Sequence, residues 1–120
     1  MTVSIHAITM DCDQPSRVAD FWSQATGRPL DHDPAPSPFF ASLGRSNPDG
    51  QPAMMFIKVP EGKAVKNRVH LDLRTEDREA EVVRLIELGA TVHSEHDEWG
   101  VRWTTMTDPE GNEFCVASHG

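Results

Sequence analysis

Two short stretches of the chain carry acid, base and thiol side chains two residues apart. The polar members of the first are His70, Asp72 and Arg74, and those of the second are Glu113 and Cys115. Side chains two apart on a strand point to the same face, so each stretch predicts one polar strand face. An imidazole and a carboxylate on such faces can transfer protons or hold a polar ligand.

Two of these residues have more than one interpretation. Asp72 can orient His70 or hold a polar substrate, or it can form a structural ion pair with Arg74. Cys115 can line a cavity beside Glu113. No second base is evident next to this thiol, which favours a small buried hydrophobe over a nucleophile.

Aromatic and histidine side chains in the segment EHDEWGVRWTT are a further candidate group. Trp103 is predicted on a strand, where its indole can stack on a planar ligand or pack in a core or dimer interface. His93 and His96 lie among three acids, which favours a solvated polar face over a ligand cluster. His32 and His119 receive the same interpretation.

Composition limits the classes of function. The chain has 120 residues, a net charge of −8 and 38% hydrophobic residues, which is typical of one globular domain without a general basic surface. We therefore expect neither nucleic acid nor an anionic membrane as partner. The longest apolar runs are too short to span a bilayer, and no leader pattern opens the chain, so a cytoplasmic location is expected. Two cysteines do not make a disulfide framework.

The first half of the chain predicts a strand over 3–12 and a helix that starts near Pro15 and ends at Gly27. After the helix, six prolines between Pro29 and Pro52 indicate loops around one short strand. A further strand follows over 53–59.

The second half repeats this order. It predicts a strand over 68–74, a helix that is capped near Asp77 and ends at Gly89, and three further strands. These three begin at Ala90, Val101 and Glu113. The chain therefore reads strand–helix–strand–strand–strand twice, an α+β fold with modules at 1–62 and 63–120 that share one domain.

Three segments together resemble the vicinal oxygen chelate superfamily, which includes glyoxalase I, bleomycin-resistance proteins, methylmalonyl-CoA epimerases and extradiol dioxygenases. They are MDCDQPSRVADFW, VHLDLRTEDREAEVVRLIELGATV and TDPEGNEFCV. The chain looks most similar to small bacterial glyoxalase-like domain proteins. The resemblance implies paired βαβββ modules whose curved mixed sheets enclose a cavity, with the helices outside. It also implies a homodimer.

The resemblance further implies metal ligands on the first and last strand of each module. His70 and Glu113 match these positions in the second module. In the first, Met55 aligns with Glu113, and a thioether is a poor ligand for Zn, Ni, Mn or Fe. Either His6 or Ala7 aligns with His70. The helix register favours Ala7, so that His6 reaches the cavity only through a bulge.

Three functions follow from this resemblance. The favoured one is a small-molecule-binding protein without bound metal, whose cavity is centred on His70 and Glu113. The second is a metal-dependent lyase, isomerase or dioxygenase that uses His6 with those two residues. The third is metal-free catalysis with Glu113 as general base and His70 as its partner. Four further residues are expected to contact the ligand: Asp72, Trp103, Met55 and Cys115. The loops of 29–52 are expected to set the choice of ligand.

Overall fold

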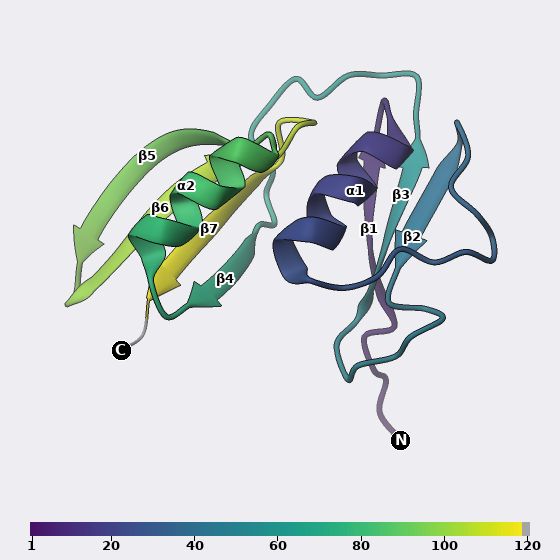
Figure 1. Ribbon diagram of the computed structural model, residues 1–120, viewed down its shortest axis with the longest axis horizontal. Coiled ribbons are helices and arrows are strands. Elements are labelled where there is room, and N and C mark those ends of the chain that lie inside the picture. The colour runs from purple at the N-terminus through teal and green to yellow at the C-terminus, as the bar shows by residue number, and fades with distance from the viewer. Residues whose placement is uncertain (119–120) are drawn as a thin grey trace. The chain divides into compact units, whose positions relative to one another are not determined.

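The computed structural model describes residues 1–118, so His119 lies outside the described part of the chain. The chain divides into two compact units, Met1–Lys63 and the part that begins at Ala64 (Figure 1). Each unit contains one helix and one mixed sheet, which confirms the predicted α+β class. Within residues 1–118, no helix is both long and apolar enough to cross a bilayer.

The first unit contains a three-stranded sheet with the strand order β1-β3-β2. Its elements are β1 (Ala7–Cys12), α1 (Pro15–Thr26), β2 (Phe40–Leu43) and β3 (Ala53–Lys58). β3 is central, with β1 parallel and β2 antiparallel to it. This unit has one regular strand fewer than the βαβββ pattern. Only Leu30 bridges to Leu43 at the open edge of β2. The prolines at 29, 34, 36 and 38 explain the difference, because proline has no N–H for a strand ladder.

The second unit contains a four-stranded sheet with the strand order β4-β7-β6-β5. Its elements are β4 (Leu71–Thr75), α2 (Arg78–Leu88), β5 (Thr91–Glu98), β6 (Val101–Thr107) and β7 (Glu113–Ser118). β4 runs parallel to β7, and the other two pairings are antiparallel. This unit has the complete βαβββ pattern.

The predicted signals bound the two helices. Pro15 occupies the first turn of α1, and Gly27 ends that helix in the left-handed region at a φ of 72°. Asp77 caps α2, because its carboxylate accepts the N–H of Ala80 at 3.1 Å. Gly89 follows the last residue of α2, as predicted.

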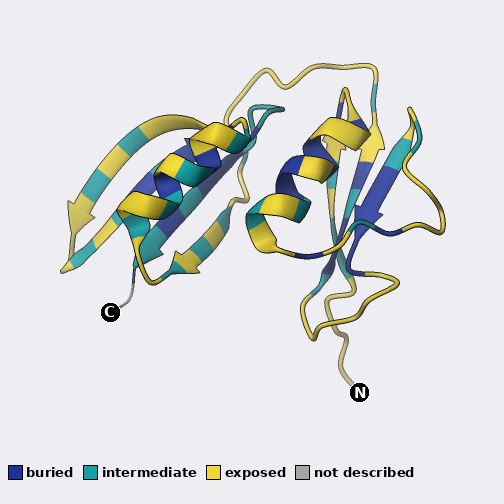
Figure 2. Cartoon of the chain, in the orientation of Figure 1, coloured by how far each residue is buried: buried dark blue, intermediate teal, exposed yellow. Residues whose placement is uncertain are grey.

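Each unit has its own apolar core between its helix and its sheet (Figure 2). In the first unit, Phe21 and Trp22 of α1 are buried, and their rings meet edge to face with centroids 5.4 Å apart. In the second unit, Leu85 of α2 is buried, as are Phe114 and Val116 of β7.

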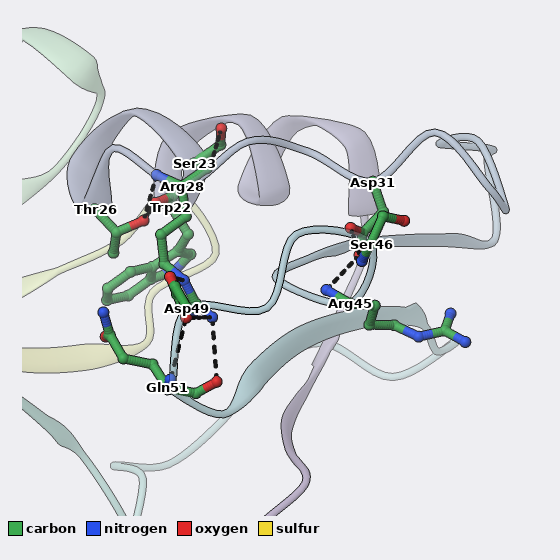
Figure 3. Close-up of polar contacts among 9 residues, drawn as sticks. All are labelled: Trp22, Ser23, Thr26, Arg28, Asp31, Arg45, Ser46, Asp49 and Gln51. Carbon is green, nitrogen blue, oxygen red and sulfur yellow. Dashed lines mark hydrogen bonds and ion pairs between the residues drawn. The ribbon is translucent and has the colours of Figure 1, made fainter.

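A buried carboxylate organises part of the proline-rich segment of the first unit (Figure 3). Asp31 is completely buried, and its side chain accepts three hydrogen bonds. The donors are the Ser42 hydroxyl at 2.7 Å, the Arg45 N–H at 3.2 Å and the Ser46 N–H at 2.9 Å. Asp31 therefore ties the chain before β2 to the turn that follows it.

A second polar contact lies in the same segment. The guanidinium of Arg28 is buried and donates two hydrogen bonds to Asp49, at 2.8 and 3.1 Å (Figure 3). Gly44 lies directly beside this guanidinium at a φ of 81°, so a side chain there would be strained and would displace Arg28. These contacts hold the loops that were expected to set ligand choice, and that role stays a prediction.

Acid is expected to destabilise the protein through Asp31. Burial by itself raises the pKa of this carboxyl, but hydrogen bonds from Ser46, Ser42 and Arg45 outweigh it and lower the pKa below its ordinary value. A lowered folded-state pKa contributes stability above the unfolded pKa of about 3.9, and that stability is lost as the pH falls through the folded-state pKa.

This dependence can be measured by urea unfolding from neutral pH down to about pH 2.5. We expect the free energy of unfolding to fall less steeply below about pH 4 in Asp31→Asn than in the wild type. Equal slopes for the two proteins would contradict the role given to Asp31.

Candidate ligand site

A hollow of about 600 Å³ lies against the sheet of the second unit. Phe114 and Val116 of β7 are buried, so strand alternation turns Glu113, Cys115 and Ala117 to the opposite face. That opposite face borders the hollow. The remaining residues around it are Lys66, His70, Asp72, Leu73, Arg74, His93, Ser94, His96, Val101, Trp103 and Thr105.

Strand pairing arranges these side chains in rows across the sheet. One row runs from β4 to β5 and contains Asp72, Cys115, Thr105 and Ser94. The next row contains Arg74, Ala117, Trp103 and His96. Ala117, which has a small side chain, lies between Arg74 and Trp103 in this row, and all three border the hollow.

His70 and Asp72 form a polar pair at the β4 side of the hollow. The distance from His70 Nε2 to Asp72 Oδ1 is 3.3 Å, so Asp72 is placed to orient the imidazole. Orienting His70 was one of the roles that the sequence left open for Asp72, and that role stays a prediction. The Cys115 thiol lies beside the pair and is 3.4 Å from the Thr105 hydroxyl.

Glu113 borders the same hollow and is 8% exposed. Its Oε1 accepts the backbone N–H of Asn67 at 2.9 Å, and the Asn67 side chain donates to Asn112 at 2.9 Å. The carboxylate thus holds the segment that leads into β4. Glu113 and His70 were predicted to form the centre of the cavity, and the structure places both on the border of this hollow.

Three aromatic rings are stacked at the β5–β6 hairpin. The rings of His96 and Trp103 are 4.9 Å apart and nearly parallel, and Trp99 lies parallel to Trp103 at 6.3 Å. Trp99 is 88% exposed and has a φ of 53°, which is unusual for a bulky residue. It forms a two-residue turn with Gly100.

His93 is exposed, in agreement with the predicted solvated polar face, whereas His96 is half-buried against Trp103, and both border the hollow. The signal that identifies His96 was present in the sequence. A two-residue turn at Trp99-Gly100 pairs Glu98 with Val101, and the same register puts His96 opposite Trp103.

A family model described as the glyoxalase-like domain matches residues 7–117. The chain belongs to this glyoxalase-like domain family. This result confirms the resemblance to the vicinal oxygen chelate superfamily. A search of curated proteins finds no significant match.

Solved structures of the superfamily share the fold of this glyoxalase-like domain. A glyoxalase/bleomycin resistance protein/dioxygenase family enzyme from Burkholderia phytofirmans PsJN has a TM-score of 0.76 at 18% identity, covering 97% of this chain and 98% of that one. A lactoylglutathione lyase from Agrobacterium tumefaciens has a TM-score of 0.66 at 15% identity, covering 98% and 94%. A fosfomycin resistance protein from Mesorhizobium loti has a TM-score of 0.73 at 11% identity, covering 100% and 95%. At these identities, the similarity shows the fold alone.

The strand ladders show which residues of the two units of this glyoxalase-like domain are equivalent. In each unit the helix begins three residues after the last residue of the preceding strand. When the first residues of the two helices, Pro15 and Arg78, are aligned, Ile8 of β1 becomes equivalent to Leu71 of β4. Ile8 pairs with Met54, and Leu71 pairs with Phe114. Met54 is therefore equivalent to Phe114, and the residue that precedes each member of a pair is equivalent to the residue that precedes the other.

This comparison places Ala7 and Ala53 of the first unit where His70 and Glu113 stand in the second. The preferred register, with Ala7 opposite His70, agrees with it. The alignment of Met55 with Glu113 is wrong by two residues, because Met55 pairs with Thr9 in the middle of β3. His6 is exposed and precedes β1.

The residues present do not fit the four-position metal set that the resemblance implies. Ala7 and Ala53 have no side-chain donor atom, so two of the four positions of this set have no metal ligand. The group that can hold a metal, among residues 1–118, consists instead of His70, Asp72 and Cys115. It includes neither Glu113 nor His6.

Proposed function

We propose that this glyoxalase-like domain binds a small organic molecule in the hollow of its second unit, without the metal set of its superfamily. The observation that carries the proposal is the hollow itself. Its volume of about 600 Å³ lies within the range of small-molecule sites, about 300–1,000 Å³. Trp103 provides an aromatic surface there, and ionisable side chains surround it.

The row that contains Trp103 indicates the chemistry of the ligand. A planar group can lie over Ala117 and stack on the indole, which His96 supports from the next strand. Arg74 lies on the other side of Ala117, and Lys66 also borders the hollow. The two carboxylates that border the hollow already have partners, because Asp72 pairs with His70 and Glu113 accepts the N–H of Asn67. The cations Arg74 and Lys66 are then the charged groups placed to bind the ligand. A planar molecule with an anionic group therefore fits this arrangement best.

Two further parts of the proposal concern the assembly and the other contacts. We propose a homodimer, as is common in the superfamily. Asp72 and Cys115 contact the ligand from the row next to Trp103. Met55 is half-buried on β3 of the first unit, and its contact with the ligand stays a prediction.

Ligand binding can be tested by quenching of tryptophan fluorescence. The panel contains planar aromatic carboxylates and the glycopeptide bleomycin. We expect at least one to quench the wild type, and Trp103→Ala to weaken its binding at least about tenfold, because the stacking surface is lost. Trp103→Phe retains a ring and should retain most of the affinity.

Trp22→Phe is the matched control for this signal, since it removes a buried indole of the first unit and leaves the hollow intact. Its affinity should equal that of the wild type. Isothermal titration calorimetry provides a readout that is independent of fluorescence. The proposal is contradicted if nothing in the panel binds, or if Trp103→Ala binds as well as the wild type.

A second candidate function is proton transfer with Glu113 as base and His70 as its partner. The observation that favours it is that both side chains border one hollow, where Asp72 is placed to orient the imidazole. Incubation of the same panel in D₂O, followed by mass spectrometry, separates the two functions, because proton transfer at a carbon replaces hydrogen by solvent deuterium. Binding without deuterium uptake supports the binding protein, and uptake that is lost in Glu113→Gln supports catalysis.

A further inference from the structure

Three potential metal ligands of different chemistry lie together on two neighbouring strands of the second unit. The imidazole of His70, the carboxylate of Asp72 and the thiol of Cys115 have donor atoms within 4.8 Å of one another. Strand pairing explains this grouping, because Asp72 is the register partner of Cys115 and His70 is two residues before Asp72. The group therefore requires no residue of the first unit.

The distance between two of these three atoms matches that of a tetrahedral site, and all three lie within 4.8 Å of one another. Bonds of about 2.0–2.3 Å to nitrogen, oxygen and sulfur separate neighbouring ligand atoms by about 3.4 Å. The distance between His70 Nε2 and Asp72 Oδ1 is 3.3 Å, which already matches this value. The side chains of His70 and Asp72 are 43% and 78% exposed, so both can rotate to complete the geometry with Cys115.

We propose that His70, Asp72 and Cys115 bind a Zn²⁺-like divalent cation, with a fourth position open to the hollow. The donor set selects the ion, because thiolate and imidazole favour Zn²⁺ or Co²⁺ over Mg²⁺ and Ca²⁺. The Thr105 hydroxyl lies 3.4 Å from Sγ, where it can donate a hydrogen bond to the bound thiolate. Three protein ligands and an open position are typical of a Zn²⁺ site that binds a further molecule.

This site differs from the four-position set that the resemblance implies. It uses Asp72 and Cys115, neither of which occupies one of the four positions, and it does not use Glu113. The proposal is independent of the small-molecule function, because metal binding is measured without any organic ligand.

Cobalt titration of the chelator-treated full chain tests the site, since bound Co²⁺ reports its ligands through its absorption spectrum. We expect one Co²⁺ per chain, with the near-ultraviolet charge-transfer band of a cobalt–thiolate bond. Zn²⁺ should displace it. Cys115→Ser should abolish the charge-transfer band, and His70→Ala and Asp72→Asn should each weaken binding at least about tenfold.

Two variants distinguish this site from its alternatives. Glu113→Gln should bind Co²⁺ as the wild type does, whereas the implied set would lose affinity. Cys12→Ser removes the other cysteine, which is buried in the first unit, and should retain the band. Circular dichroism verifies that each variant is folded. The proposal is overturned if folded wild type binds no stoichiometric Co²⁺, if the band persists in Cys115→Ser, or if Glu113→Gln loses the metal.

Discussion

Asp31→Ala is expected to lower the free energy of unfolding by about 3 kcal/mol. The carboxylate of Asp31 is fully buried and accepts hydrogen bonds from the Ser42 hydroxyl and from the N–H groups of Arg45 and Ser46. Alanine removes all three acceptor contacts and leaves a polar cavity. Loss of a buried hydrogen-bond network is one of the mechanisms that make a single substitution severely destabilising.

Two further variants make the result specific to this network. Asp31→Asn retains one acceptor oxygen and is expected to lose about half as much stability. Asp33→Asn is the matched control, because Asp33 is exposed two residues further on, and it should change stability by less than about 0.5 kcal/mol. Urea unfolding followed by circular dichroism measures all three. A change below 1 kcal/mol in Asp31→Ala would show that the network is not structural.

Phe114→Ala is expected to destabilise the second unit by about 3–5 kcal/mol. Phe114 is 1% exposed and lies in β7 between the two hollow-facing residues Glu113 and Cys115. Its removal leaves a cavity in the core that α2 covers. Because β7 pairs with both β4 and β6, the loss should extend to the strands that carry the candidate site.

Native-state hydrogen exchange measures this effect strand by strand. In Phe114→Ala, the amides of β4, β6 and β7 should exchange faster by at least about two orders of magnitude if they open with the core. Val83→Ala is the control on α2, because Val83 is 57% exposed and should alter exchange little. Unchanged protection of β7 in the Phe114 variant would show that the ring contributes little to this core.

The helices and the strand faces could be predicted from the sequence because they depend on local signals. Pro15 and Gly27 bound α1, and Asp77 caps α2, as their types predicted. The alternation in β4 and β7 also predicted which residues share a face, such as Glu113 with Cys115. These features depend on residues only a few positions apart, so periodicity and caps are sufficient to identify them.

The neighbours across the sheet could not be predicted in the same way. Local patterns do not state which residues of two distant strands stand opposite each other, so Met55 was aligned with Glu113 although Ala53 holds that position. The strand that the repeat predicted in the first unit is reduced to a bridge at Leu30.

Local sequence patterns predicted the family, the fold class and the residues that share each polar strand face. The position of Asp72 beside Cys115 follows only from the folded sheet, because these residues are far apart in the chain. Side-chain direction depends on the local backbone, whereas the register of distant strands depends on packing and pairing between them. A register shift of one residue would turn these side chains away from the hollow.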